Sequence, residues 1–251
     1  MKILAITQAR VGSSRLQKKI LKKINDISLL KIHLDRIKKS KNISKLVIAT
    51  TNENESEKIV KIGEDAKVES YRGSLKNVLK RFYDISVVEK PDWIVRLTSD
   101  CPLIDPKLID EIVTFAINND FDYVSNTLKP SYPDGLDVEI FKSKVLNVAY
   151  KNASLKSEQE HVTPYIWKNS TFFGKDKFTS ANYKCENNFS KYRLTVDYIE
   201  DLNLISELIK KLGVDLSWKE YVNYLNLNSN LLKKNNNIIR NDGYLKSIND
   251  E

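Results

Sequence analysis

The chain opens with the apolar run Ile3-Leu4-Ala5-Ile6, and Gln8-Ala-Arg-Val-Gly-Ser-Ser-Arg-Leu-Gln-Lys-Lys19 follows almost at once. The first run predicts a buried strand, and the second predicts a turn of small and cationic residues. Small side chains let backbone N–H groups approach an anion closely, here at Gly12, Ser13 and Ser14. Three full positive charges lie in the same turn, on Arg10, Arg15 and Lys19. The stretch therefore predicts either a polyphosphate-binding loop or an ordinary basic surface turn.

Apolar strand patterns and amphipathic helix patterns alternate beyond this loop. Strands are expected at residues 3–7, 46–50, 68–71 and 93–97, with helices at 29–39, 55–64, 76–89 and 107–118. This alternation predicts βαβ units, and therefore an α/β fold with a mostly parallel sheet. Such sheets bind ligands at the carboxyl ends of their strands. The basic loop, Thr50, the turn Arg72-Gly73-Ser74 and the run Thr98-Ser99-Asp100 all fall at those ends.

The second half of the chain is less regular. Further strands are expected at residues 123–125, 136–141 and 172–178, with helices at 200–212 and 218–225. From residue 228 to 251 the chain is rich in Asn, Lys and Ser, which predicts a tail laid over the domain or partly disordered. We therefore expect one domain at residues 1–227, with an irregular segment at about 129–178, and a tail at 228–251.

Composition limits the classes of function. The chain has 251 residues, 41% of them hydrophobic, which is enough for a substantial core. We expect no membrane partner and a cytoplasmic location, because the sequence has neither a long apolar run nor a signal-peptide pattern. Two cysteines make neither a disulfide framework nor a zinc site. The net charge of +8 comes from lysines spread along the chain without an RNA-binding motif, so nucleic acid is not the expected partner.

Arginine is scarce, with 8 residues against 33 lysines. A chain that uses lysine for most of its positive charge keeps arginine where its planar fork matters. Six of the eight arginines lie in or beside the segments singled out in this section, and the two others are Arg36 and Arg240. The scarcity suggests that the arginines in these segments contact ligands or brace other charged groups.

Two aspartates, Asp100 and Asp197, each follow an apolar strand pattern. Either one is a metal ligand or a helix N-cap; Asp105 before Pro106 fits a cap better than Asp100, and Glu200 completes a capping-box pattern after Asp197. Mg²⁺ is commonly held by one or two carboxylates together with substrate phosphates. Two such aspartates beside a basic loop predict a nucleotidyl or phosphoryl transferase. GxxxxGK[ST], GxGxxG and GxSxG motifs are absent.

The loop at residues 8–19 resembles the signature of cytidylyltransferases that activate acidic sugars, such as the CMP-KDO and CMP-sialic acid synthetases. The resemblance is strongest to the spore coat polysaccharide biosynthesis cytidylyltransferase family. Further matching segments run in family order over about residues 1–205: Tyr71-Arg-Gly-Ser74 with Arg81-Phe82, Arg96-Leu-Thr-Ser-Asp-Cys-Pro-Leu-Ile-Asp105, Asp122-Tyr-Val-Ser-Asn-Thr127, Tyr132-Pro-Asp-Gly-Leu-Asp-Val-Glu139, Glu160-His-Val-Thr-Pro-Tyr165 and Arg193-Leu-Thr-Val-Asp197.

This resemblance implies a three-layer nucleotide-diphospho-sugar transferase fold and a reaction of CTP with an acceptor oxygen that releases pyrophosphate. It implies that Arg10, Arg15 and Lys19 neutralise the triphosphate, and that Asp100 and Asp197 hold Mg²⁺. The residues expected to bind nucleotide are Gln8, Ala9, Arg10, Gly12, Ser13, Ser14, Arg15, Lys19, Thr50, Arg72, Gly73, Ser74 and Ser99. The turn at 72–74 is expected near the cytosine base.

The acceptor is expected to be a small acidic sugar. The residues expected around it are Tyr132, Asp134, Asp137, Glu139, Glu160, His161 and Arg193. His161 and Arg193 also fit structural roles, with Arg193 bracing an aspartate. A phosphorylated acceptor giving a CDP-linked product and a homologue that only binds nucleotide stay open as alternatives. Related synthetases suggest a homodimer through the segment at 129–178.

The loop departs from the family pattern in two places. Gln17-Lys18 stands where Pro-Gly is usual before the loop lysine, and Ser99 stands where glycine is usual before the metal aspartate. Ser99 is expected to be tolerated unless the backbone there needs a positive φ. Whether Lys18 faces the phosphates or the solvent is left open by the sequence.

Overall fold

The computed structural model describes residues 1–13 and 15–249. Within these residues seven strands form one sheet in the order β5-β4-β1-β6-β8-β7-β9. Only β8 runs antiparallel to its neighbours β6 and β7, so the expected mixed, mostly parallel sheet is confirmed. The strands are β1 (Ile3–Gln8), β4 (Lys45–Thr51), β5 (Glu69–Gly73), β6 (Trp93–Thr98), β7 (Tyr123–Ser125), β8 (Glu139–Lys142) and β9 (Ser180–Asn182).

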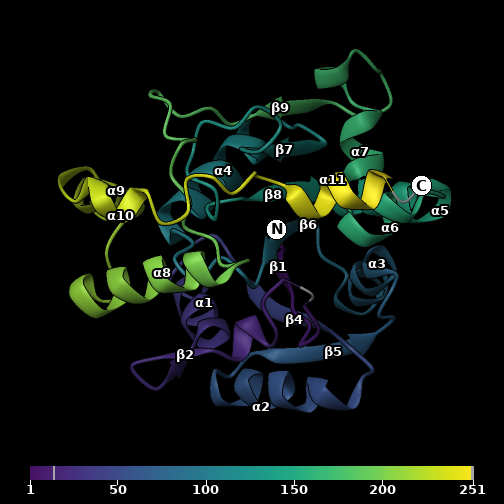
Figure 1. The fold of residues 1–251 in the computed structure, drawn as a ribbon. Coiled ribbons are helices and arrows are strands. Elements are labelled where there is room, and N and C mark those ends of the chain that lie inside the picture. The colour runs from purple at the N-terminus through teal and green to yellow at the C-terminus, as the bar shows by residue number, and fades with distance from the viewer. Residues whose placement is uncertain (14, 250–251) are drawn as a thin grey trace.

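Helices cover both faces of the sheet and make three layers (Figure 1). Alternate residues of β1 point to opposite faces, so Ile3 and Ala5 join one core cluster while Leu4 and Ile6 join another. The first face packs against α1 (Leu29–Ile37), α2 (Glu57–Asp65), α4 (Pro106–Asn118), α8 (Ile199–Leu212) and α9 (Trp218–Leu227). The second packs against α3 (Val78–Glu89), α5 (Ser143–Asn152), α6 (Lys156–His161) and α7 (Pro164–Lys168).

Two predicted strands in the second half need correction. The strand expected at 172–178 is wrong: a 3-10 turn, η3 (Thr171–Phe173), stands there and Gly174 turns the chain with φ +72°. The edge strand β9 begins only at Ser180. The strand expected at 136–141 begins at Glu139, because the Asn126 side chain bonds to the backbone of Leu136 and Val138 in place of a neighbouring strand.

Short elements complete the fold. They are η1 (Lys19–Leu21), β2 (Lys23–Ile24), β3 (Ile27–Ser28), η2 (Asn54–Ser56), α10 (Ser229–Leu232) and α11 (Asp242–Asn249). The described part of the tail is ordered against the domain, and α11 crosses the sheet to reach α6 (Figure 1). Of the helices described, none has the length and apolarity needed to cross a membrane.

The sheet topology creates a crevice beside β1. The connection through α1 leads from β1 to β4 on one side, whereas the connection through α3 brings the chain back to β6 on the other. Open α/β sheets bind ligands at such a reversal of strand order. Gln8 at the end of β1 pairs with Thr98 at the end of β6, so the loops after these two strands leave the sheet side by side.

Candidate active site

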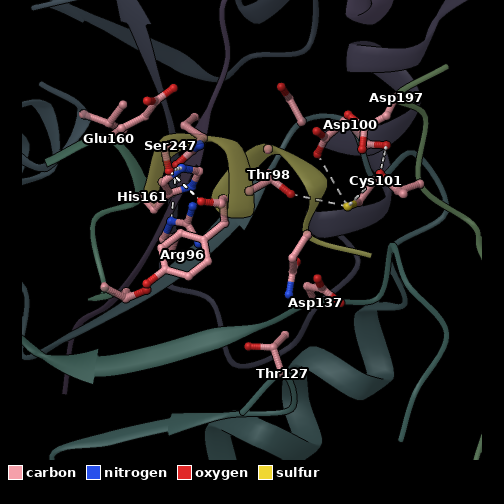
Figure 2. Close-up of a pocket in the computed structure, with 18 of the residues that line it drawn as sticks. Arg96, Thr98, Asp100, Cys101, Thr127, Asp137, Glu160, His161, Asp197 and Ser247 are labelled. Carbon is pink, nitrogen blue, oxygen red and sulfur yellow. Dashed lines mark hydrogen bonds between the residues drawn. The ribbon is translucent and has the colours of Figure 1, made fainter. Parts of the chain in front are cut away.

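A cavity of about 710 Å³ opens at the carboxyl ends of β1 and β6. It brings together most of the predicted nucleotide and metal residues: Gln8, Ala9, Arg10, Gly12, Ser13, Arg15, Lys19, Ser99, Asp100 and Asp197. It also gathers most of the predicted acceptor residues: Asp134, Asp137, Glu139, Glu160 and His161. Ser14 lies outside the described residues. Figure 2 shows how distant parts of the chain meet here, with Asp100 and Asp197 on one side and Glu160 and His161 on the other.

Lys19 lies between the two predicted metal aspartates. Its Nζ donates to Asp100 Oδ2 and to Asp197 Oδ1, at 2.7 Å in each case. Burial opposes the ionisation of Asp100, but the charge and hydrogen bond of Lys19 outweigh it and hold the Asp100 pKa well below its usual range. The same two carboxylates raise the Lys19 pKa against the effect of burial. Lys19 and Asp100 are therefore both charged at neutral pH.

The donor set fits a divalent cation that also binds phosphate. Two carboxylates already share one cation, the Lys19 ammonium, which marks the point between them as a site for positive charge. Among the described residues there is no cluster of three or more His, Cys, Asp or Glu side chains able to hold a metal. A cation held by these two carboxylates alone would need further oxygen atoms from substrate or water.

The backbone ties the two aspartate loops together. The carbonyl of Asp100 accepts hydrogen bonds from Val196 N at 2.8 Å and from Thr195 Oγ1 at 3.1 Å. Asp201, not Glu200, accepts from the backbone N–H groups of Asp197 and Tyr198 at the start of α8. The helix N-cap is Tyr198, so the alternative in which Asp197 caps the helix is wrong.

Arg193 braces the site and does not line the cavity. Its guanidinium pairs with Asp197 at 3.0 Å, with Asp201 at 2.9 Å and with Asp134. These bonds engage all three of its nitrogens, as expected for the alternative in which Arg193 braces an aspartate. Binding of the acceptor by Arg193 stays a prediction.

His33 supports the Asp100 loop from beneath. Its ring is fully buried, with Nδ1 at 2.8 Å from the Cys101 carbonyl and Nε2 at 2.9 Å from Thr7 Oγ1. A carbonyl only accepts, so Nδ1 carries the proton and Nε2 accepts from the threonine hydroxyl. Burial lowers the His33 pKa to about 4, which keeps the ring neutral.

Burial also raises the pKa of the Cys101 thiol, which disfavours a nucleophilic role for this cysteine.

The basic loop keeps a glycine-like bend without glycine. Lys18 has φ +55° and ψ +30°, the left-handed conformation, at the position where the family usually carries glycine. Its ammonium pairs with Glu55 at 3.1 Å, both side chains being half exposed, and it does not line the cavity. Ser99, in contrast, is not among the residues with a positive φ, so serine fits there without strain.

Besides Arg193, five predicted residues are not among those that line the cavity: Thr50, Arg72, Gly73, Ser74 and Tyr132. Arg72 pairs with Glu57 on the surface, and Ser74 accepts from Asn77 N at the start of α3. Tyr132 is buried against Trp218, although its carbonyl accepts from Arg240. The turn at 72–74 instead makes room for Arg81, because a Cβ on Gly73 would lie 2.7 Å from Arg81 Cγ.

Arg81 and Arg96 line the cavity but were not among the predicted site residues. Arg81 Nη1 donates to the Ala49 carbonyl at 2.7 Å, and no described carboxylate lies within ion-pair distance of it. Burial and the charge of Arg10 lower the Arg81 pKa to about 10, so it remains a cation in the cavity wall. The scarcity of arginine pointed to both residues, and both also stand in the segments that resemble the family.

The part of the cavity lined by the predicted acceptor residues holds several carboxylates that already have partners. Glu139 accepts from Arg96, from Thr163 and from Tyr123 Oη at 2.6 Å. Asp137 pairs with Arg240. Glu160 lies 3.7 Å from Arg10, a loose ion pair. Burial, together with the charges of Arg96 and Arg10, lowers the His161 pKa to about 4, so the imidazole is neutral at pH 7.

Comparison with known proteins identifies the family of this chain. A family model described as cytidylyltransferase matches residues 4–238. The spore coat polysaccharide biosynthesis protein SpsF of Bacillus subtilis is 34% identical over 238 residues, which cover 90% of this chain and 95% of that protein. A cytidylyltransferase from Leptospira borgpetersenii has a similar structure, with a TM-score of 0.88 at 34% identity over 95% of this chain and 99% of that one.

A more distant structure shows the same fold. It is a CMP:2-keto-3-deoxy-manno-octonic acid synthetase solved with CTP, with a TM-score of 0.64 at 14% identity. The match covers 84% of this chain and 99% of the synthetase chain. At that identity the likeness speaks for the fold alone.

Proposed function

This chain belongs to the cytidylyltransferase family, and from that premise we propose that it transfers CMP from CTP to a small acidic sugar and releases pyrophosphate. The observation that carries the proposal is the position of Lys19 between Asp100 and Asp197. Lys19 ends the basic loop, whose other two cations, Arg10 and Arg15, also line the cavity. This arrangement pairs a site for phosphate charge with a site for a divalent cation. The strand-end crevice is also where this fold class binds nucleotides.

The proposed reaction is attack of an acceptor oxygen on the α-phosphorus, with breakage of the bond to the β-phosphate oxygen. Arg10, Arg15 and Lys19 would offset the charge of the triphosphate and of the departing pyrophosphate. Asp100 and Asp197 would hold Mg²⁺, which supplies positive charge to the phosphate oxygens and helps to align them. Arg193 would keep Asp197 in place for this task.

Arg81 and Val78, both lining the cavity from α3, replace the turn at 72–74 as the nearest candidates for contact with the base.

The proposal of an acidic sugar as the acceptor is supported by the family resemblance and by the name of the relative SpsF, a spore coat polysaccharide biosynthesis protein. If the acceptor oxygen belongs to a phosphate instead, the product is CDP-linked, and the mass of the product distinguishes the two acceptors.

A homodimer through the segment at 129–178 stays a prediction that light scattering would test.

The test is selective stabilisation by nucleotide. With Mg²⁺ present, CTP at about 100 times its Kd is expected to raise the Tm by about 5 to 10 °C in a chain of this length. ATP and GTP at the same concentration are expected to raise it much less. Equal shifts from all three nucleotides would remove cytidylyl specificity from the proposal. Pyrophosphate release across a panel of sugar acids then identifies the acceptor.

A further inference from the structure

The C-terminal segment at residues 240–247 forms part of the cavity wall. Its lining residues are Asn241, Asp242, Gly243, Tyr244, Lys246 and Ser247. The match to the family model ends at residue 238, so this wall comes from outside the matched region. Figure 1 shows α11, in yellow, crossing the sheet to α6, and Figure 2 shows Ser247 beside His161 at the far end.

Both ends of the segment are attached to the site. Arg240 donates to the Tyr132 carbonyl at 3.0 Å and pairs with Asp137, which fixes the start of the segment. Ser247 Oγ lies 3.0 Å from His161 Nε2, and the Tyr244 ring meets the His161 ring edge to face at 5.1 Å. The segment is thus attached at its start by the contacts of Arg240 and near its end by Ser247 and by the Tyr244 ring, which also packs against Trp167.

Asp242 lies on the basic loop between these two attachments. Its Oδ2 is 3.4 Å from Arg15 Nη1 and accepts from Tyr198 Oη and Lys246 Nζ, at 2.8 Å in each case. The backbone at Gly243 also lies close to Arg15, because a Cβ added to Gly243 would be 3.3 Å from Arg15 Nη1. Since Arg15 Nη2 pairs with Asp197, carboxylates already hold both ends of this guanidinium.

We propose that residues 240–247 form a gate on the nucleotide site, in which Asp242 holds Arg15 until a nucleotide phosphate takes the place of its carboxylate. A phosphate and the Asp242 carboxylate are like charges, so sharing Arg15 at contact distance is unfavourable. The exchange releases Asp242 from Arg15 and loosens this wall of the cavity between its two attachments. The inference rests on the proposed role of the loop in binding phosphate.

The competition is expected to be modest. The side chains of Arg15 and Asp242 are each more than a fifth exposed, and a partly exposed ion pair is weak. Removing the carboxylate is therefore expected to tighten nucleotide binding by about two- to fivefold. A gate of this strength lowers the affinity for any phosphate ligand at Arg15 by the same modest factor.

The test compares three variants of the full chain. Asp242→Asn removes the competing charge, Asp242→Glu keeps it, and Asp35→Asn removes one carboxylate of the Lys31–Asp35 pair on α1, outside the cavity. The Kd is measured calorimetrically for CTP and for inorganic triphosphate, which has no base. Hydrogen exchange of residues 240–247 is measured with and without each ligand.

Asp242→Asn is expected to bind both ligands about two- to fivefold more tightly, while Asp242→Glu and Asp35→Asn stay near the wild type. Exchange in the segment is expected to rise when either ligand binds the wild type. Unchanged or weaker binding by Asp242→Asn, or slower exchange on binding, overturns the gate. A wild type that prefers another nucleotide refutes the proposed function, yet the triphosphate measurements still decide whether the gate exists.

Discussion

Single residues in this site are understood through the charges that each one faces. Lys19 serves as the cation between Asp100 and Asp197, and Arg193 holds Asp197 from the opposite side. Outside the predicted site segments, Arg36 donates to the backbone carbonyls of Ile104, Val214 and Leu216 from a buried position. Most of the scarce arginines thus hold other groups in place, as the planar fork permits.

The two aspartates give a direct test at this scale. Asp100→Asn and Asp197→Asn are each expected to lower Mg²⁺-dependent pyrophosphate release at least ~10²-fold, because the amide neither holds the metal nor balances Lys19. The initial rate of pyrophosphate release with saturating CTP and acceptor measures this.

Asp35→Asn serves as the matched control for these substitutions, since Asp35 pairs with Lys31 on the surface of α1, outside the cavity. Its activity is expected to equal that of the wild type. Circular dichroism shows whether the site variants keep their fold. Full activity in either site variant would refute the metal assignment.

At the scale of elements, the loop at residues 8–19 shows how conformation is kept when sequence changes. The chain bends at Lys18 with φ +55°, and the 3-10 turn η1 begins at the next residue, Lys19. A lysine in this region costs about 1 kcal/mol or more relative to glycine. The surrounding fold therefore imposes this bend, and the ion pair with Glu55 offsets part of its cost.

Substitutions at Lys18 separate the backbone from the ion pair. Lys18→Gly is expected to keep CTP binding and to change the free energy of unfolding by between 0 and about +1 kcal/mol, since relief of strain opposes the entropy of glycine. Lys18→Val is expected to lower it by about 1 to 2 kcal/mol, because a β-branched residue fits this conformation poorly. Urea unfolding measures both.

Glu55→Gln is the matched control for the ion pair, because it removes the charge that Lys18 faces and leaves the bend intact. It is expected to change the free energy of unfolding by less than about 0.5 kcal/mol. If Lys18→Gly destabilises the chain by more than this control does, the bend is not strained by lysine.

At the scale of the whole molecule, the cavity joins segments far apart in sequence, and both histidines support it. His33 lies beneath the Asp100 loop and His161 lies in the opposite wall. Burial is the main cause that lowers the pKa of each ring from 6.5 to about 4. Protonation of either ring therefore works against the folded state.

This linkage predicts acid sensitivity. Between about pH 6.5 and 4 the unfolded chain binds protons on both histidines that the folded chain does not, so stability falls as the pH drops through this range and is fully present above it. Buried His33 alone is expected to account for about 3 kcal/mol. Urea unfolding at pH 7.5, 6.5, 5.5 and 4.5 measures the slope.

His33→Asn tests the assignment, because its amide retains a donor for the Cys101 carbonyl and does not titrate. The variant is expected to be less stable at pH 7.5 but to lose less stability on acidification. An unchanged slope would show that carboxylates, not His33, cause the acid sensitivity.

The sequence by itself determined the class of fold and the central part of the site. Period-two and helical apolar patterns are local, so the alternating elements of the first half were predicted closely, and parallel strands put Arg10, Lys19 and Asp100 at one edge. The pattern after β6 also identified Asp105 as the cap of α4, where its carboxylate accepts from Lys107 N and Leu108 N. The family motifs narrowed the chemistry to cytidylyl transfer.

Only the tertiary structure decided which of the remaining candidates reach the cavity. Thr50 and the turn at 72–74 have the right position along their strands, but β4 and β5 lie progressively further from the β1–β6 crevice. Tyr132 and Arg193 are committed to packing and to bracing. The polar tail carries no periodic signal that places Asp242 on Arg15, because contacts between residues 227 positions apart depend on how the whole chain packs.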